Sequence, residues 1–377
     1  MGKIMVVAGE VSGDMHASRV IREIKKISPE IDFFGMGSDS LRDEGVRILI
    51  DPMEVSTIGF FEAFKNIRTH LSNLKILKKA IDKENPDLIF LVDNSGFNMM
   101  MARAAYKKGV PVVNYFSPSA WVWGQWRAKW MARYKATIAS VFPMEAKVYK
   151  EAGAEVVFVG HPLVDIVKVP QEADDIYSEL ELDTEKKIIA LLPGSRSQEI
   201  DKLLPEMLKT AERIQKIRKD YQFLIPLAKG VDKNKISQMA AKYNLIIKLV
   251  EDKTYEVIKT SDLIIAASGT VTLEASIIGT PMVIIYKVGN LSYYLAKKLV
   301  KLDYIGLPNI IAEREVVPEL VQGEANSDHL YTTVMSLLRK TYNLNTMRKE
   351  LSYIKEKLGS TGAVRRTAEL ILRKGRL

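Results

Sequence analysis

Residues 262–286 form the segment that most constrains the fold of this chain. An apolar run at 263–267 ends in Ser268, Gly269 and Thr270 and passes directly into a short helical pattern. The helical pattern ends before Pro281, and a second apolar run follows at once. A strand, a tight turn, a helix and a second strand in this order make a parallel βαβ unit. The sequence therefore predicts a parallel sheet with connecting helices, the arrangement of an α/β protein.

The turn at 268–270 is a candidate site for a diphosphate. It places the free backbone N–H groups of a helix start, and the positive end of the helix dipole, at the carboxyl edge of a sheet. Glu274 lies one turn into the helix, where its carboxylate can accept hydrogen bonds from ribose hydroxyls. The alternative is a βαβ connection that binds no ligand, because small residues are common in such turns.

A second segment, at 186–200, favours the ligand-binding interpretation. It is again a strand that runs into a Pro-Gly turn and a helix, with Ser195 or Ser197 expected as the N-cap. Arg196 lies in that turn, and its forked guanidinium suits phosphate oxygens. Neither segment has the P-loop pattern or the G-x-G-x-x-G pattern, which argues against an NTPase and against a dinucleotide site. The sequence thus favours a nucleotide diphosphate bound by two loops of one domain.

Strands and helices alternate along most of the 377 residues. The expected strands lie at 3–8, 31–35, 46–50, 87–93, 110–115, 136–141, 156–159, 187–192, 222–227, 245–249, 262–267 and 282–286. The stretch 160–185 loses this periodicity, so we expect a linker there. The sequence predicts two doubly wound, Rossmann-like domains that face each other across a cleft. The expected boundaries are 1–165 for the first domain, 166–185 for the linker, 186–345 for the second domain and 346–377 for a C-terminal helical segment.

Composition limits the classes of partner and site. The chain has no cysteine and 4 histidines, which excludes disulfides and thiolate metal sites and fits a reducing compartment. No uncharged apolar run approaches the ~20 residues that span a bilayer, and the first residues are typical of a core strand and not of a signal peptide. The formal net charge of +9 favours an anionic partner, such as a phosphorylated substrate, an anionic lipid surface or nucleic acid.

Acid–base candidates follow two expected strands of the first half. Glu10, Asp14 and His16 come directly after the strand at 3–8, and Asp93 ends the strand at 87–93. Groups at the carboxyl edge of a sheet are well placed for proton transfer. For Asp14 the alternative role is a cap of its own helix, and for Asp93 it is an Asx turn.

Two further segments combine apolar and basic residues. Along 56–83, Phe60, Phe61, Phe64 and Ile67 contribute to a broad apolar face, with lysines and arginines on the remainder. This pattern is typical of a helix on an anionic membrane surface, or of a core helix with solvated lysines.

All four tryptophans lie at 121–130, beside three basic residues, and Trp123, Trp126 and Trp130 are expected on one helical face. The alternatives for this face are a local aromatic core and an apolar wall suited to acyl chains or an interface.

Several motifs together resemble one family, the bacterial lipid-A-disaccharide synthases, which are GT-B glycosyltransferases. The resemblance runs nearly end to end. It rests on A-G-E-V-S-G-D (8–14), D-N-S-G-F-N (93–98), S-P-S-A-W-V-W (117–123), F-P-M-E (142–145), F-V-G-H-P-L-V-D (158–165), L-L-P-G-S-R (191–196), A-S-G-T-V-T-L-E (267–274), P-M-V-I-I-Y-K (281–287), L-P-N-I-I-A (307–312) and V-P-E-L-V-Q (317–322). Each motif is modest alone, and their joint order is specific.

The resemblance implies an inverting hexosyltransferase that acts on lipid substrates. It would transfer 2,3-diacylglucosamine from its UDP donor to the 6-hydroxyl of 2,3-diacylglucosamine 1-phosphate, releasing UDP and the β-1,6 tetraacyl disaccharide 1-phosphate precursor of lipid A. The first domain would bind the acceptor and face the membrane, and the second would bind the UDP-sugar. The implied location is cytoplasmic and peripheral to the inner membrane, with an anionic membrane surface as partner, no nucleic acid, and a homodimer left open.

The motifs and the resemblance together suggest roles for individual residues. The expected UDP-sugar site comprises Ser195, Arg196, Ser268, Gly269, Thr270, Glu274, Tyr286, Asn309 and Gln322. The expected catalytic residues are Asp93, Glu10 and Arg196, with Asp93 the first choice for general base. Family members of the best-studied branch carry aspartate where this chain has Gly96, so that carboxylate is missing here. Phe60, Phe61, Phe64, Ile67 and Trp123 are the expected membrane-facing or acyl-facing residues. No metal and no cofactor is expected, because backbone amides and arginine take over the role of a cation.

Two other classes of protein remain as alternatives. A UDP-N-acetylglucosamine 2-epimerase-like enzyme would share the two domains and a UDP site but would not require acyl-binding faces. A non-catalytic lipid-binding protein would use the charge but would not require two converging phosphate loops.

Overall fold

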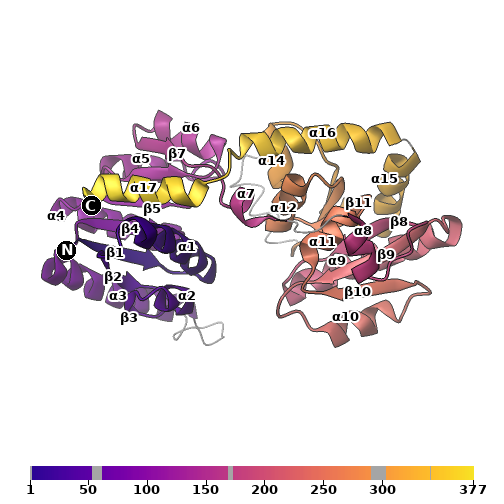
Figure 1. Cartoon of the computed structure of the whole chain (residues 1–377), viewed down its shortest axis with the longest axis horizontal. Coiled ribbons are helices and arrows are strands. Elements are labelled where there is room, and N and C mark those ends of the chain that lie inside the picture. Colours follow the sequence, from indigo (N-terminus) through magenta and orange to yellow (C-terminus); the bar gives the residue numbers. More distant parts are fainter. Residues whose placement is uncertain (1, 53–61, 169–172, 290–302, 340) are drawn as a thin grey trace. The chain divides into compact units, whose positions relative to one another are not determined.

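The chain forms two compact α/β units in the computed structural model (Figure 1), which describes residues 2–52, 62–168, 173–289, 303–339 and 341–377. Unit 1 comprises Met1–Asp165 and Leu358–Leu377, and unit 2 comprises Ile166–Lys357. The chain therefore passes between the units twice. The segment expected as a linker, 166–185, lies within unit 2, and the expected C-terminal segment, 346–377, is divided between the two units.

Unit 1 is built on a seven-stranded parallel sheet with the order β3-β2-β1-β4-β5-β6-β7. Its strands are β1 (Lys3–Ala8), β2 (Asp32–Met36), β3 (Arg47–Ile50), β4 (Leu88–Val92), β5 (Val112–Tyr115), β6 (Thr137–Ser140) and β7 (Glu155–Phe158). Its helices are α1 (Val11–Ile27), α2 (Asp39–Asp43), α3 (Glu62–Glu84), α4 (Ser95–Lys108), α5 (Trp126–Arg133), α6 (Pro143–Glu151), α7 (Leu163–Ile166, which reaches into unit 2) and α17 (Ala363–Gly375).

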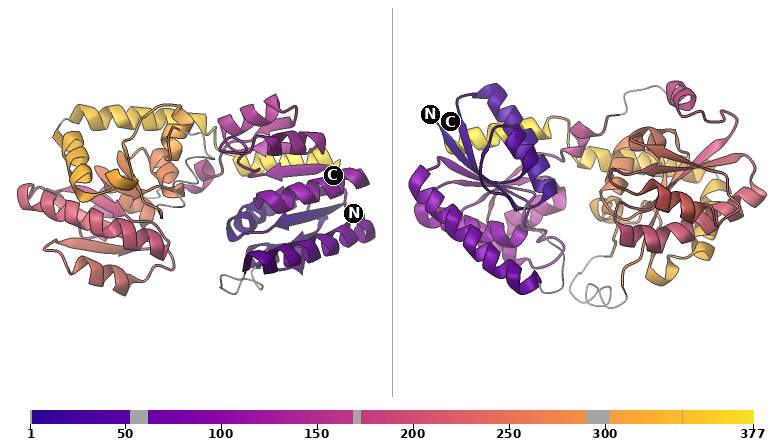
Figure 2. Two further views of the ribbon diagram at one scale, coloured as in Figure 1. Left: turned by 180° about the vertical axis from the view of Figure 1, so that it is seen from behind. Right: turned by 90° about the horizontal axis from the view of Figure 1, so that it is seen from below.

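Both faces of this sheet are buried, which explains why its central strands are apolar throughout. Alternate residues of β1 enter two different cores: Met5 packs with α3, α4 and α5, whereas Ile4 packs with α1 and α17. The same alternation holds along β4, where every residue is buried. Figure 2 shows helices on both sides of the sheet.

The last helix, α17, completes unit 1 although it is far from the other elements of that unit in sequence. It packs against α1 (Figure 1, yellow beside indigo), with Leu370 and Ile371 in the same core as β1. Asp165 accepts a hydrogen bond from the backbone N–H of Gly362 at 2.5 Å, and Lys374 pairs with Glu155 at 2.5 Å. These contacts fix both ends of the returning segment to the body of unit 1.

Unit 2 repeats the topology of unit 1 with six strands in the order β10-β9-β8-β11-β12-β13. The strands are β8 (Lys187–Leu192), β9 (Tyr221–Leu227), β10 (Ile247–Glu251), β11 (Leu263–Ala267), β12 (Met282–Tyr286) and β13 (Glu319–Val321). The helices are α8 (Ala173–Glu179), α9 (Ser197–Ile217), α10 (Lys233–Ala240), α11 (Thr254–Thr260), α12 (Thr270–Ile278), α14 (Leu307–Ala312), α15 (Ser327–Arg339) and α16 (Thr341–Lys357), with a 3₁₀ turn at Gln322–Glu324.

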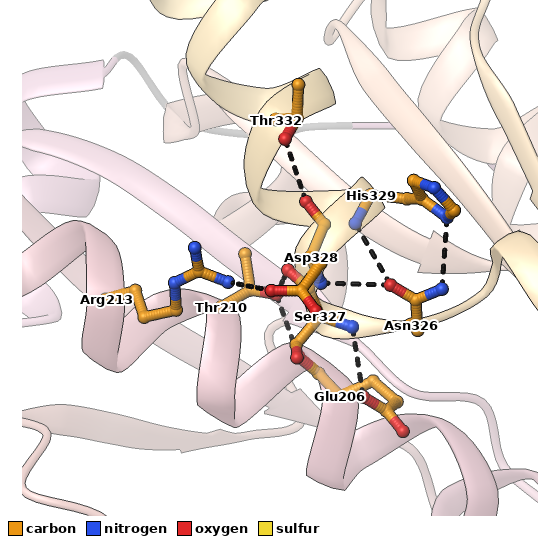
Figure 3. Close-up of polar contacts among 8 residues, drawn as sticks. All are labelled: Glu206, Thr210, Arg213, Asn326, Ser327, Asp328, His329 and Thr332. Atoms are coloured by element: carbon orange, nitrogen blue, oxygen red, sulfur yellow. Dashed lines mark hydrogen bonds and ion pairs between the residues drawn. The ribbon is translucent and has the colours of Figure 1, made fainter.

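Polar contacts fix the start of α15 to the side of α9 (Figure 3). Asn326 caps α15, because its Oδ1 accepts a hydrogen bond from the backbone N–H of Asp328 at 3.0 Å. Glu206 of α9 accepts from the N–H of Ser327 at 3.0 Å, and Arg213 of α9 pairs with Asp328 at 2.6 Å. Asn326 and Glu206 thus satisfy free N–H groups at the start of α15. Glu206 and the Arg213–Asp328 ion pair join this helix start to α9.

Helix starts differ from the expected positions in three places. The apolar patterns predict helices at 14–27 and 98–108, whereas α1 begins at Val11 and α4 at Ser95. α5 begins only at Trp126, so Trp123 precedes the helix and the expected single helical face of Trp123, Trp126 and Trp130 is wrong in that respect. Gly124, with φ of +69°, separates Trp123 from the helix.

Candidate nucleotide-binding site

The carboxyl edge of the unit 2 sheet has the geometry of a ligand site. β8 and β11 are neighbours in the sheet, and the strand order runs away from them in opposite directions. This is the topological switch point, where the loops that leave adjacent strands separate and open a crevice. The two segments singled out in the sequence, at 192–197 and 267–270, are the loops that leave these two strands.

The loop after β8 requires glycine at one position. Gly194 has φ of +101°, and a Cβ there would lie 2.4 Å from the Oε2 atom of Glu199. The following helix, α9, has Arg196 as its N-cap without a side-chain capping bond, so the expected capping by Ser195 or Ser197 is wrong. The hydroxyl of Ser197 instead accepts a hydrogen bond from Lys235 at 2.7 Å.

The loop after β11 leaves its backbone accessible. Gly269 is extended, with φ of 168°, and a Cβ placed on it would meet no atom within 4 Å. α12 begins at the next residue, Thr270, and Thr272 closes the first turn with its N–H and its hydroxyl, both on the carbonyl of Gly269. The first N–H groups of α12 therefore lie beside open space and not beneath a side chain.

Both loops line one pocket of about 600 Å³ within unit 2. A volume of this size lies in the range of small-molecule sites. The pocket is lined by Leu192, Pro193, Gly194, Ser195, Arg196, Glu199, Pro226, Ala228, Lys229, Thr254, Tyr255, Ala267, Ser268, Gly269, Thr270, Val271 and Glu274. The structure therefore brings together six of the residues proposed from the sequence: Ser195, Arg196, Ser268, Gly269, Thr270 and Glu274.

Glu274 lies half-buried in the pocket wall. Burial raises the pKa of its carboxyl group, and a hydrogen bond from the hydroxyl of Tyr255 acts in the opposite direction. The Tyr255 oxygen lies 3.0 Å from the Oε1 atom of Glu274. One carboxylate oxygen of Glu274, Oε1, thus accepts a hydrogen bond from the protein itself.

Arg196 provides a mobile positive charge at the pocket rim. Its side chain is 83% exposed, and its guanidinium contacts the carboxylate of Glu199 at 2.9 Å. An exposed ion pair of this kind contributes little to stability, so the guanidinium can exchange Glu199 for a phosphate oxygen at small cost.

Three residues proposed for the same site lie elsewhere in unit 2. Asn309 is fully buried, where its side chain bonds the backbone of Val316 and Val317 and the carboxylate of Glu319. Gln322 bonds the backbone N–H of Val288 at 2.7 Å. Tyr286 ends β12 and is also not among the residues that line the pocket.

Sequence reasoning missed Lys229, Thr254 and Tyr255, which line the pocket from two other loops. Lys229 follows β9, and Thr254 and Tyr255 begin the helix after β10. β9 and β10 end at the same sheet edge as β8 and β11. Ligands of such sheets bind at the carboxyl ends of the strands, so the loops after β9 and β10 could have been proposed on the same ground.

The corresponding edge of unit 1 brings two carboxylates together. Glu10 follows β1 and Asp93 follows β4, and β1 and β4 are adjacent in the sheet. Burial and, to a smaller extent, the charge of Asp93 raise the pKa of Glu10. Asp93 accepts hydrogen bonds from the hydroxyl of Ser12 and from the backbone N–H of Asn94, both at 2.9 Å.

Asp14 has a different role from the expected one. Its two carboxylate oxygens accept hydrogen bonds from the backbone N–H groups of Ser38 and Ser40, at 2.6 and 2.9 Å. It therefore caps the start of α2 and not its own helix. His16 is mostly buried and stacks on Phe116 at 4.3 Å, and burial lowers its pKa to about 4.

The expected membrane-facing residues are described only in part. Phe60 and Phe61 lie outside the described residues, and for Phe64 and Ile67 only the backbone, in α3, is described. Trp123 is exposed, as are Trp126 and Trp130. Arg127 lies over the ring of Trp123 at 3.5 Å, so this aromatic surface is also cationic.

Among the described residues, no helix is long and apolar enough to cross a membrane. No cluster of three or more His, Cys, Asp or Glu side chains in the same residues has a metal-binding arrangement.

Solved structures with low sequence identity share this fold. The UDP-GlcNAc 2-epimerase of Neisseria meningitidis, bound to UDP-GlcNAc, has a TM-score of 0.66 at 13% identity, covering 98% of this chain and 100% of that chain. MurG of Acinetobacter baumannii has a TM-score of 0.61 at 14% identity, covering 99% of each chain. These likenesses confirm the predicted GT-B fold class.

Sequence comparisons identify the family. A lipid-A-disaccharide synthase of Geobacter sulfurreducens is 39% identical over 370 residues, covering 98% of this chain and 96% of that protein. The enzyme of the same name from Nitrosococcus oceani is 38% identical, covering 97% of this chain and 95% of that protein. The family described as lipid-A-disaccharide synthetase matches residues 4–372. The chain therefore belongs to the lipid-A-disaccharide synthetase family.

Proposed function

We propose that this chain is an inverting glycosyltransferase that forms the disaccharide of lipid A. The donor is UDP-2,3-diacylglucosamine, the acceptor is 2,3-diacylglucosamine 1-phosphate, and the products are UDP and the β-1,6-linked tetraacyl disaccharide 1-phosphate. One observation carries this assignment beyond family membership: two phosphate-type loops line a single pocket in unit 2. A non-catalytic lipid-binding protein has no use for such a pocket.

The diphosphate of the donor would be held by backbone and arginine together. The first N–H groups of α12 follow Gly269, whose backbone borders open space, and the helix dipole favours negative charge at this end of the helix. Arg196 would leave Glu199 and contact a phosphate oxygen. Negative charge on UDP grows as the glycosidic bond breaks. The backbone N–H groups and Arg196 therefore stabilise the departing UDP more than they stabilise the bound substrate.

The acceptor hydroxyl requires a general base, which we assign to the Glu10 and Asp93 pair. Asp93 was the first choice from the sequence, but both of its oxygens already accept hydrogen bonds. Burial and, to a smaller extent, the charge of Asp93 raise the pKa of Glu10, which is the direction that favours a general base. We therefore propose that Glu10 takes the proton and that the negative charge of Asp93 keeps Glu10 basic.

An assay of the products separates this function from that of a UDP-N-acetylglucosamine 2-epimerase. Purified protein is incubated with UDP-2,3-diacylglucosamine and 2,3-diacylglucosamine 1-phosphate, and the lipids are separated by thin-layer chromatography. The expected result is a tetraacyl disaccharide phosphate that depends on both substrates, with UDP released in equal amount. A parallel reaction contains only UDP-N-acetylglucosamine. Appearance of its manno epimer, without disaccharide in the first reaction, would replace the proposed function with an epimerase.

We also propose that unit 1 contacts an anionic membrane surface through a tryptophan-rich face. This face comprises α5 and the turn before it, with Trp123, Trp126 and Trp130 between 38% and 51% exposed. Residues 94–144 contain seven Lys or Arg and no Asp or Glu. Tryptophan favours the headgroup layer of a bilayer, and juxtaposed basic residues are attracted to anionic lipids.

A further inference from the structure

The hydrogen bond between Tyr255 and Glu274 joins two helices at the wall of the pocket. Tyr255 is the second residue of α11, and Glu274 lies in the second turn of α12. The two helices pack against each other, and both side chains line the pocket. The bond therefore fixes a carboxylate that faces the ligand by means of a residue from a different element.

Glu274 needs such a partner because its surroundings oppose its charge. Burial is the larger influence on its pKa and raises it, and the Tyr255 hydroxyl is the influence that lowers it. The other charged side chains that line the pocket are Arg196 with its partner Glu199, and Lys229 after β9. Without the hydroxyl, the carboxyl group would be less ionised at a given pH and free to adopt other rotamers.

Ionisation and orientation both matter for binding a sugar. A carboxylate accepts hydrogen bonds with both oxygens, whereas its protonated form loses part of this capacity. Because Tyr255 holds Oε1, the orientation of the carboxylate is fixed. Oε2 can then accept a hydrogen bond from a sugar hydroxyl in a defined direction. A ligand that lacks the hydroxyl would cover a half-buried carboxylate oxygen without giving it a partner, and such an omission is costly.

We propose that Tyr255 is a positioning residue that holds Glu274 to read the ribose hydroxyls, so that the pocket selects ribonucleoside over deoxyribonucleoside diphosphates. This inference rests on the proposed function, because it requires a nucleoside diphosphate in this pocket. No motif of the sequence indicated Tyr255. The proposed selection of ribose over deoxyribose is also independent of the acyl chains of the donor.

Calorimetric titration with UDP and with 2′-deoxyuridine diphosphate tests the proposal. The native protein is expected to bind UDP about tenfold or more tightly than the deoxy ligand, the selectivity typical of a hydrogen bond to a charged group. Tyr255→Phe keeps the ring but removes the hydroxyl. It is expected to weaken UDP binding about tenfold, to change deoxy-ligand binding less than about twofold, and so to remove the selectivity.

Two further variants control the experiment. Tyr331→Phe removes a hydroxyl from a tyrosine on α15 that stacks on Arg213 outside the pocket, and its binding ratio is expected to equal that of the native protein. In a Glu274→Gln background, Tyr255→Phe is expected to have no further effect on the ratio, because the two side chains act as one unit.

Kinetics and pH supply readouts that a merely structural role would not change. Tyr255→Phe is expected to raise the KM for the donor while kcat stays within about twofold, which is the signature of lost ground-state binding. The acidic limb of UDP binding is expected to move to higher pH, since loss of the hydroxyl raises the pKa of Glu274 further.

The outcomes separate this inference from the proposed function. If the native protein binds UDP but not in preference to the deoxy ligand, or if Tyr255→Phe keeps the native ratio, the positioning role is overturned while the glycosyltransferase assignment stands. If the native protein binds neither ligand, the nucleotide site itself is absent and both proposals fail.

Discussion

At the scale of single residues, the chemistry depends on which carboxylate of unit 1 takes the acceptor proton. Glu10 and Asp93 leave adjacent strands, and a Cβ on Gly9 would lie 1.9 Å from the side-chain nitrogen of Asn94. The close approach of the two loops thus requires glycine and brings the carboxylates within reach of each other's charge. Burial is the larger cause of the raised pKa of Glu10, and the charge of Asp93 adds to it in the same direction.

Substitutions at these two positions have different expected effects on the pH–rate profile. Glu10→Gln is expected to lower kcat by about 10²- to 10⁴-fold and to remove the acidic limb. Asp93→Asn removes the smaller of the two influences that raise the pKa of Glu10, the larger being burial, so the acidic limb is expected to persist and to move to lower pH. The measurement is kcat/KM against pH for both variants. Loss of the limb in Asp93→Asn, with the limb retained in Glu10→Gln, would instead identify Asp93 as the base.

Residue type alone could not distinguish side chains that line the pocket from those that hold the backbone. Asn309 and Glu274 are both polar residues in motifs of the second half, yet Asn309 bonds a buried turn while Glu274 lines the pocket. The two cases differ only in what surrounds each side chain, which the sequence does not contain. Tyr255 was missed for the converse reason, since no pattern marks it as the partner of Glu274.

At the scale of elements, two glycines at the pocket have opposite structural requirements. Gly194 has a left-handed backbone and no room for a side chain, whereas Gly269 is extended and faces open space. Gly194→Ala is therefore expected to destabilise unit 2 by about 1–2 kcal/mol, from the positive φ alone.

Gly269→Val is expected to leave the melting temperature unchanged and to reduce UDP affinity at least about tenfold, because its side chain would cover the N–H groups that α12 presents. Thermal unfolding and UDP titration of both glycine variants check these expectations. A large fall in melting temperature for Gly269→Val would mean that the loop packs more tightly than the structure shows.

The tryptophan-rich face predicts a specific dependence of membrane binding on α5. Replacing Trp126 and Trp130 together by serine is expected to lower binding to phosphatidylglycerol vesicles by about tenfold, because both rings leave the interfacial layer. Tyr353→Ser, on an exposed aromatic of α16, serves as the matched control. Vesicle co-sedimentation at low and high salt is the measurement. Equal loss of binding in both variants would mean that exposed aromatics act non-specifically.

The sequence predicted whole elements better than their ends. Buried parallel strands are continuous apolar runs, so β4 (Leu88–Val92) and β11 (Leu263–Ala267) were evident. The short elements β13 and α2 were missed because three to five residues carry too little periodicity. Helix α1 begins earlier than its pattern because Glu10, in an extended conformation, starts it directly after the strand.

At the scale of the whole molecule, unit 1 contains buried ionisable groups whose effects on stability oppose each other. Burial lowers the pKa of His16 to about 4 and of His161 to about 3, and it raises the pKa of Glu145 to about 7. The unfolded chain takes up two protons on the histidines below pH 6.5, while the folded chain takes up one on Glu145 below pH 7. The unfolded state therefore binds about one proton more between pH 6.5 and 4.5.

This difference predicts how unit 1 loses stability in acid. The free energy of unfolding is expected to fall by about 1.4 kcal/mol for each pH unit between 6.5 and 4.5. In Glu145→Gln the opposing proton is absent, so the slope is expected to be about twice as steep. Urea unfolding at a series of pH values, followed by tryptophan fluorescence because all four tryptophans lie in unit 1, measures the slope. A stability that does not change over this window would contradict the burial of the two histidines.

The return of α17 to unit 1 has a consequence for how the protein is made. Leu370 and Ile371 fill the core beside β1, and they are synthesised after the whole of unit 2. During translation the first 165 residues therefore keep an apolar surface uncovered until residues 166–357 have been made. Removing α17 would accordingly damage the unit that is synthesised first, while unit 2 would keep all of its residues.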